Sequence, residues 1–147
     1  MAERRISLLN GLNMTNLGKR DQHIYGTIES LAALEALVID TGQKFGLSVE
    51  AFHHNDEGGL VDYIEQTVGR FDGYLINPGG LWAYGDPTRI ALQQTGRPVV
   101  EVHFANIHAT GGRSVFTESV DGTVMGMRQF GYLGGLAALA CMVGAQT

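Results

Sequence analysis

The chain has 147 residues, 44% hydrophobic and 17% charged, with a formal net charge of −5, a balance that excludes a disordered segment. One domain spanning residues 1–147 fits this length, which allows a packed core without disulfides or metal ions. The ten Lys and Arg residues are scattered, whereas nucleic-acid binding needs a clustered basic face, so we expect a small-molecule ligand and no nucleic acid.

The start of the chain predicts a cytoplasmic protein. Residues 1–5 carry charge, but only Ile6–Leu9 follow as an apolar stretch before Asn10, and this is too short for the core of a signal peptide. The apolar run from Tyr132 to Ala145 also falls short of the roughly 20 residues that span a bilayer. We therefore expect no membrane association.

Apolar runs of strand length recur five times along the chain, separated by stretches with helical spacing. They are Ile6–Leu9, Leu47–Phe52, Gly73–Ile76, Pro98–Val102 and Gly122–Met127. Alternation of helices with strands that are apolar along most of their length is typical of a parallel sheet covered by helices. The predicted fold is α/β, a flavodoxin-like doubly wound sheet of five parallel strands with helices on both faces.

Three helices are expected between and after these strands. The first lies within Ser30–Phe45 and has an apolar stripe formed by Leu31, Leu34, Leu37 and Val38. The second runs from about Asp56 to Arg70, capped by Asn55, with inward-facing Leu60, Val61, Ile64 and Val68. The last covers Tyr132–Ala145 and contains the single cysteine, Cys141, as inert apolar filling in a reducing compartment.

A glycine-rich loop follows the first strand and carries Arg20 and then Tyr25. A tyrosine hydroxyl loses its proton near pH ~10, so it becomes a base at neutral pH only where a cation stabilises the phenolate. Arg20 is the nearest cation in the sequence. For these two residues in isolation, a half-buried aromatic side chain and a solvated loop charge are the simpler interpretation.

Two later strands also end in polar residues. Asn77 follows the third strand, and Glu101 and His103 lie two apart on the fourth, so their side chains project from one face. A carboxylate can then orient the imidazole and keep it partly protonated, as a general acid requires. For this pair alone, a structural role is the simpler interpretation. Ligands of doubly wound sheets bind beyond the carboxyl ends of the strands, where all these residues fall.

No metal or cofactor site is expected. The cluster His53-His54-Asn55-Asp56-Glu57 lacks recognised zinc or di-metal spacing, and adjacent strand residues point to opposite faces. The sequence also lacks a Walker loop, a GxGxxG turn, a GxSxG elbow and a cysteine nucleophile with partners.

Six short motifs, taken together, resemble the type II 3-dehydroquinate dehydratase family across nearly the whole chain. They are Asn10-Gly11-x-Asn13, Leu17-Gly18-x-Arg20, Tyr25-Gly26, Asn55-x-Glu57-Gly58, Ile76-Asn77-Pro78-Gly79 and Glu101-Val102-His103-x-x-Asn106-Ile107-His108-Ala109. The resemblance implies the flavodoxin-like fold, a homo-oligomer that is a dodecamer built from trimers, and a place in shikimate or quinate metabolism.

The resemblance also implies a cofactor-free anti elimination of water from a carboxylate substrate. In that reaction Tyr25 is the base and Arg20 lowers its pKa, Asn13 holds a water at the enolate, and His103, oriented by Glu101, protonates the leaving hydroxyl. The substrate carboxylate is expected to bind Asn77 and backbone amides after His103, which belong to Phe104, Ala105 and Asn106.

This sequence departs from the family pattern where the ring hydroxyls of the substrate bind. Ala83 replaces a histidine, Ile90 an aspartate that reaches a neighbouring subunit, and Thr110 and Ser114 two arginines, with Arg113 the candidate substitute; Leu12 replaces a proline. Each lost hydrogen bond is worth about 0.5–1.5 kcal/mol. The alternatives are therefore a family member acting on a less hydroxylated carboxylated substrate and, third, a non-catalytic carboxylate-binding scaffold.

Overall fold

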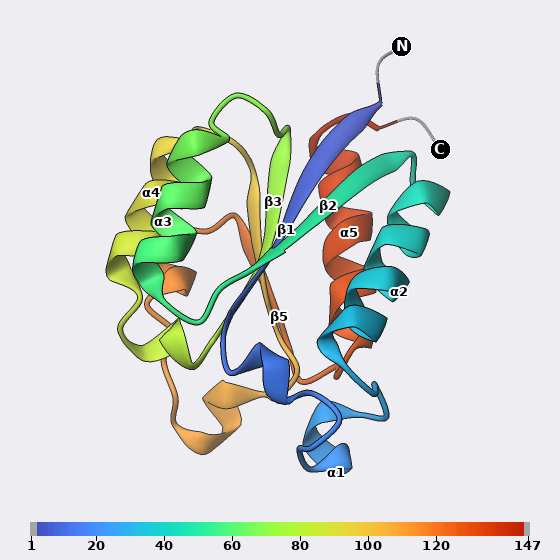
Figure 1. Cartoon of the computed structure of the whole chain (residues 1–147), viewed down its shortest axis with the longest axis vertical. Coiled ribbons are helices and arrows are strands. Elements are labelled where there is room, and N and C mark those ends of the chain that lie inside the picture. Colours follow the sequence, from blue (N-terminus) through green and yellow to red (C-terminus); the bar gives the residue numbers. More distant parts are fainter. Residues whose placement is uncertain (1–2, 146–147) are drawn as a thin grey trace.

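One parallel sheet organises the computed structural model, which describes residues 3–145 (Figure 1). The strand order is β2-β1-β3-β4-β5. The strands are β1 (Arg4–Leu12), β2 (Leu47–His53), β3 (Gly73–Gly79), β4 (Val99–His103) and β5 (Gly122–Met125). The predicted α/β fold with five parallel strands is confirmed, and each strand begins or ends within a few residues of its expected position.

Helices cover both faces of the sheet, as expected. α2 (Leu31–Lys44) and α5 (Phe130–Met142) pack on one face, and α3 (Glu57–Gln66) and α4 (Asp86–Gln94) pack on the other (Figure 1). α4 lies in a stretch where the sequence analysis singled out no helix. Short helices occupy the loops, namely α1 (Gln22–Tyr25), η1 (Met14–Asn16), η2 (Gly80–Ala83), η3 (Ile107–Thr110) and η4 (Phe116–Glu118).

The two faces of the sheet divide the core because strand residues alternate in direction. On β1, Leu8 packs toward α2 and α5, whereas its neighbour Leu9 packs toward α3 and α4. On β3, Leu75 and Ile76 divide in the same way. This alternation decides on which side of the sheet each polar residue at a strand end projects.

Two glycines allow β1 and β3 to approach closely at their carboxyl ends. A Cβ on Gly11 would lie 2.2 Å from the carbonyl oxygen of Pro78, and one on Gly79 would lie 2.1 Å from that of Leu12. Gly79 also has φ +58°, a conformation that side chains with a Cβ rarely adopt. The close approach therefore fixes the backbone at the carboxyl ends of β1 and β3.

Three predictions about the helices are wrong. Asn55 does not cap α3: the N-cap is Asp56, while the side chain of Asn55 accepts the backbone N–H of Asn13. Val68 is 63% exposed because α3 ends at Gln66, two residues before it. Cys141 is exposed on α5 and is not core filling.

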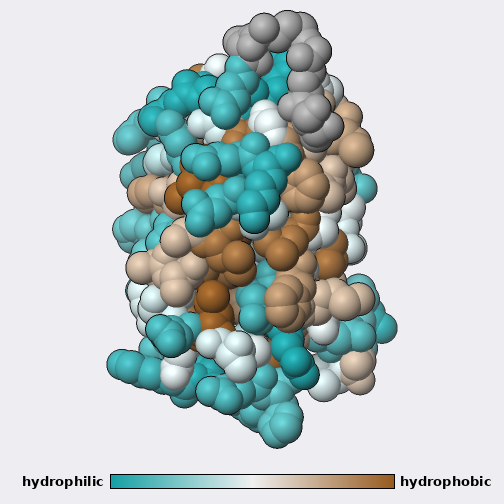
Figure 2. Space-filling model, turned by 90° about the vertical axis from the view of Figure 1, so that its right-hand side faces the viewer, coloured by the Kyte–Doolittle hydropathy of each residue, from teal (hydrophilic) through white to brown (hydrophobic). Residues whose placement is uncertain are grey.

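α5 is apolar on every side, although only one side faces the sheet. Its inward residues include Leu136 and Leu139, whereas Phe130 and Met142 are exposed. The molecule accordingly shows apolar surface on the side formed by α2 and α5 (Figure 2). Within residues 3–145, no helix has the length and apolarity that crossing a membrane requires. Met1 and Ala2, part of the charged start, lie outside the described residues.

Candidate active site

A cleft opens at the carboxyl ends of β1, β3 and β4, where ligands of doubly wound sheets bind. Six residues selected from the sequence line it: Arg20, Tyr25, Asn77, His103, Phe104 and Ala105. The cleft is completed by Met14, Gly79, Trp82 and Ile107. The structure therefore brings together residues from three separate segments of the chain.

Arg20 and Tyr25 form a pair on one side of the cleft. Asp21 caps α1 by accepting the backbone N–H of His23, and this short helix places Tyr25 within reach of Arg20. The guanidinium donates a hydrogen bond of 2.5 Å to the phenolic oxygen, and its carbon lies 3.8 Å from the ring centroid. Phe104 packs against the Tyr25 ring with centroids 5.9 Å apart. A cation placed here can neutralise negative charge on the phenolic oxygen.

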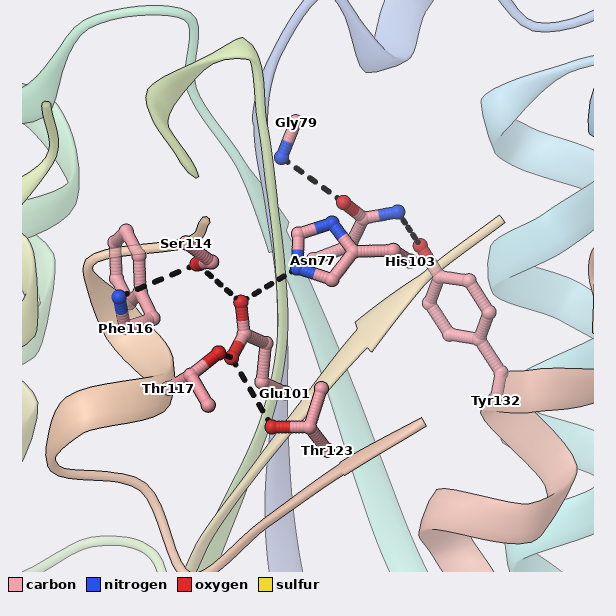
Figure 3. Close-up of polar contacts among 9 residues, drawn as sticks. All are labelled: Asn77, Gly79, Glu101, His103, Ser114, Phe116, Thr117, Thr123 and Tyr132. Atoms are coloured by element: carbon pink, nitrogen blue, oxygen red, sulfur yellow. Dashed lines mark hydrogen bonds and ion pairs between the residues drawn. The ribbon is translucent and has the colours of Figure 1, made fainter. Parts of the chain in front are cut away.

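Glu101 and His103 form the second pair, on the face of β4 that also carries Val99 (Figure 3). Both are buried, and 2.5 Å separates Oε2 of Glu101 from Nε2 of His103. Since Nε2 is held by the carboxylate, Nδ1 is the ring nitrogen left to exchange a proton with a ligand. Because the Nε2–H group already donates to the carboxylate, Nδ1 carries a proton only when the imidazole is charged.

The Glu101 carboxylate receives three further hydrogen bonds. The Ser114 hydroxyl donates to Oε2 at 2.5 Å, and the hydroxyls of Thr117 and Thr123 donate to Oε1 at 2.8 and 3.2 Å (Figure 3). Burial raises the pKa of this carboxyl, but the hydrogen bonds from His103 and Ser114 outweigh burial, so the pKa of Glu101 is lowered from its usual 4.5. Glu101 is therefore ionised at neutral pH.

Asn77 projects from the other face of the sheet and belongs to a neutral network. Its Oδ1 accepts the N–H of Gly79 at 2.9 Å, and its Nδ2 donates to the Tyr132 hydroxyl at 2.9 Å (Figure 3). Tyr132 in turn donates to Oδ1 of Asn10 at 2.6 Å. Burial strongly raises the pKa of Tyr132 and outweighs the hydrogen bond from Asn77, so this phenol stays neutral.

The remaining site candidates do not line the cleft. Asn13 is exposed and its backbone N–H is bound to the Asn55 side chain at 3.2 Å. Asn106 caps η3 by accepting the N–H of Ala109, and Arg113 is exposed and donates to the carbonyl oxygen of Gly112 at 2.7 Å. Their roles in binding stay predictions.

The positions that depart from the family pattern also lie away from the cleft or have new partners. Ala83 and Ile90 are exposed and do not line it. Trp82 does line it, and its ring sits where a Cβ on Gly112 would come within 3.2 Å. The Trp82 carbonyl oxygen accepts the N–H of Val115 at 2.9 Å, which ties η2 to the loop after β4. Trp82, Met14, Phe104 and Ile107 are the apolar side chains that line the cleft.

Sequence reasoning missed the groups that support the site. Ser114 was considered only as a lost arginine, although it binds Glu101, and Tyr132 only as part of an apolar helix. A hydroxyl in an otherwise apolar run is a usable signal for Tyr132, because burying it without partners costs free energy. Nothing in the spacing points to Thr117 or Thr123.

The two adjacent histidines at the end of β2, His53 and His54, have separate surroundings. Nδ1 of His54 accepts the N–H of Asp56 at 3.0 Å, whereas Nε2 of His53 is buried and has no partner among the described residues. In the described part of the chain, no group of three or more His, Cys, Asp or Glu side chains is arranged to hold a metal ion.

Comparison with known proteins identifies the family. Residues 4–140 match the model of dehydroquinase class II. The 3-dehydroquinate dehydratase of Thermotoga maritima is 40% identical over 132 residues, 88% of this chain and 90% of that protein. Catabolic 3-dehydroquinase 1 of Aspergillus terreus is 38% identical over 130 residues, 86% of this chain and 85% of that protein.

The fold agrees with this assignment. The crystal structure of type II dehydroquinase from Propionibacterium acnes superposes with a TM-score of 0.86 at 34% identity, covering 94% of this chain and 97% of that one. The Thermotoga maritima relative of this chain is named a dehydratase, which is a hydro-lyase. The chain therefore belongs to the dehydroquinase class II family, as its motifs predicted.

Proposed function

We propose that this protein is a 3-dehydroquinate dehydratase that removes water by anti elimination. The observation that carries the proposal is that one cleft contains two oppositely suited pairs, Arg20 with Tyr25 and Glu101 with His103. A phenol beside a cation suits proton removal, and an imidazole beside a carboxylate suits proton donation. The names of the relatives support the substrate.

The first step is proton abstraction from the carbon next to the substrate ketone. The Tyr25 phenolate, with Arg20 beside it, takes this proton, and the C–H electron pair moves into the carbonyl to give an enolate. In the proposal Asn13 holds a water that hydrogen-bonds the enolate oxygen. This water stabilises the negative charge that the enolate oxygen carries only after the proton has left.

The second step expels the hydroxyl group. The enolate electron pair returns to form the carbon–carbon double bond while the C–O bond breaks, and Nδ1 of the His103 imidazolium gives the departing oxygen its proton. Water leaves, and transfer of the proton from Tyr25 through solvent to His103 restores both groups. Glu101 holds the imidazolium throughout.

The substrate carboxylate is proposed to bind between Asn77 and the backbone amides of Phe104 and Ala105. All three residues line the cleft beside His103. Asn106 and Arg113 follow in the same loop and are proposed to add contacts when it closes on the substrate. Neutral donors suit this task, since Arg20 is already bound to Tyr25.

Turnover of 3-dehydroquinate by the wild type and by Tyr25→Phe tests the proposal. Wild-type turnover at ordinary enzyme efficiency, kcat/KM of about 10⁴ M⁻¹s⁻¹ or more, is expected, and Tyr25→Phe should abolish it. Tyr84→Phe is the matched control, because Tyr84 is 55% exposed and does not line the cleft. Equal turnover by Tyr25→Phe and the wild type would refute the assignment of the base.

A second candidate is the same reaction on a less hydroxylated carboxylate. The apolar lining residues Met14, Trp82, Phe104 and Ile107 favour it, as does the absence of a histidine at position 83, which is Ala83. The two candidates are distinguished by measuring kcat/KM for 3-dehydroquinate and for a panel of β-hydroxy ketone carboxylates that carry fewer ring hydroxyls. Ordinary efficiency on 3-dehydroquinate would exclude the altered substrate.

We propose in addition that the protein works as a homo-oligomer, a dodecamer of trimers, in the cytoplasm and in shikimate or quinate metabolism. The name of the catabolic relative supports the quinate direction for this chain. Light scattering during size-exclusion chromatography tests the assembly, and a monomer at micromolar concentration would refute it.

A further inference from the structure

Tyr132 is buried where a phenylalanine would fill the same space without burying a hydroxyl. It lies on α5, whose other side chains, Cys141 excepted, are wholly apolar, and its exposed fraction is 0%. Tyr74 of β3 is equally buried, but its hydroxyl has no partner among the described residues. The Tyr132 hydroxyl, in contrast, both accepts and donates a hydrogen bond.

The donor and acceptor roles in these hydrogen bonds fix the orientation of the Asn77 amide. The Tyr132 hydroxyl has one proton, which it donates to Oδ1 of Asn10, so it can only accept from Asn77. At the other end, the N–H of Gly79 can only donate, so it requires the oxygen of the amide. A flipped Asn77 would set donor against donor at Gly79 and acceptor against acceptor at Tyr132.

Both anchors of the amide are themselves rigid. Asn10 and Asn77 are register partners on adjacent strands. Gly79 is held by the close approach of β1 and β3, where a Cβ would meet the Leu12 carbonyl oxygen at 2.1 Å. Tyr132 bridges the two asparagines from the third residue of α5. The second N–H of Asn77 Nδ2 has no partner within residues 3–145, and Asn77 lines the cleft.

We propose that Tyr132 is a positioning residue that acts through Asn77. Its hydroxyl holds the Asn77 amide with Nδ2 as the donor end, so that the uncommitted N–H is presented to the substrate carboxylate. This inference rests on the proposed function, since it assigns that N–H to binding the carboxylate of 3-dehydroquinate. Tyr132 itself touches no substrate.

Steady-state kinetics of Tyr132→Phe and Tyr74→Phe on 3-dehydroquinate test the proposal. Tyr132→Phe should raise KM about tenfold and leave kcat within about twofold, because a ground-state contact is lost. Tyr74→Phe removes an equally buried hydroxyl from the core on the other face of the sheet and should change neither constant. Unchanged KM in Tyr132→Phe, or an equal rise in both variants, would overturn the proposal.

A double variant separates positioning from general damage. In an Asn77→Ala background, Tyr132→Phe should have no further effect on KM, since the amide through which it acts is gone. A tenfold rise that persists there would contradict the proposal. If Tyr132→Phe does not fold, Asn10→Leu serves instead, because it removes the acceptor that orients the Tyr132 hydroxyl and should also raise KM.

Hydrogen exchange of the Gly79 amide gives a readout that does not need turnover. Freeing Asn77 should expose this amide, so Tyr132→Phe should accelerate its exchange about tenfold relative to the wild type, and Tyr74→Phe should not. Unchanged exchange in Tyr132→Phe overturns the positioning role. Absence of wild-type turnover with accelerated exchange would instead refute the proposed function while the positioning role stands.

Discussion

The two halves of the cleft are supported in different ways on opposite faces of the sheet. On the α3 and α4 side, the ionised Glu101 holds His103 and receives hydroxyl hydrogen bonds from the segment after β4 and from β5. On the α5 side, the neutral network of Asn10, Tyr132 and Asn77 is built from elements of the core. In the first, charged half, the imidazole proposed to donate a proton is thus held by a carboxylate. In the second, neutral half, the Asn77 amide proposed only to bind is held by neutral dipoles.

The largest effect is expected from removing the imidazole of the charged half. His103→Gln should lower kcat on 3-dehydroquinate by about 10²–10⁴-fold, the usual contribution of a positioned general acid. Steady-state kinetics measure it, with His54→Gln as the control because His54 is exposed and outside the cleft. A loss under threefold would show that the leaving hydroxyl takes its proton from another group.

Glu101→Gln should be the most destabilising single-atom change in the charged half. The carboxamide sets its NH₂ group against hydroxyl or imidazole donors, so we expect a loss of about 3 kcal/mol in the free energy of unfolding at pH 7. Urea denaturation measures the loss. Glu118→Gln, an exposed carboxylate in the same region, should stay within about 0.5 kcal/mol.

The difference in free energy of unfolding between the wild type and Glu101→Gln, called the stability gap below, should depend on pH. Since folding lowers the pKa of Glu101, the folded state favours the carboxylate, and the stability this contributes is present above its usual 4.5. The gap should therefore be constant near neutral pH and shrink as pH falls below 4.5 toward 3. Urea denaturation at several pH values checks it, and a gap that grows on acidification would contradict the lowered pKa.

In the neutral half, the loss of stability in Tyr132→Phe should not depend on pH. We expect a loss of about 1–2 kcal/mol, because two buried hydrogen bonds disappear. Since its raised pKa keeps Tyr132 neutral, this loss should be the same at pH 7 and pH 4. The same denaturation series measures it. A pH-dependent loss would show that the two halves are electrostatically coupled.

The smallest effects should rank the donors to Glu101. Ser114→Ala removes the shorter hydrogen bond and should cost about 1–2 kcal/mol, while Thr123→Val, at 3.2 Å, should cost about 0.5 kcal/mol. Unfolding free energies at pH 7 give the ranking. The reverse order would mean that Oε1, and not Oε2, bears most of the charge.

The fold and the cleft follow from local patterns, and the supporting networks do not. Two-residue alternation placed Glu101 and His103 on one face, and the strand ends placed Asn77 beside them. Ser114 and Tyr132 lie 13 and 122 residues from their partners, so only the folded chain shows these contacts. The end of α3 was also missed: the helix stops at Gln66, and Gly69 follows with φ +82°, which leaves Val68 outside the helix and exposed.

The register of β1 against β3 has a consequence for how this sequence can change. Asn10 and Asn77 are paired across the two strands, and both project toward α5. Inserting one residue between Ile6 and Asn10 would send the Asn10 side chain to the opposite layer, since strand side chains alternate. Length changes in descendants of this chain should accordingly accumulate in connecting loops, while β1 and β3 keep their residue count.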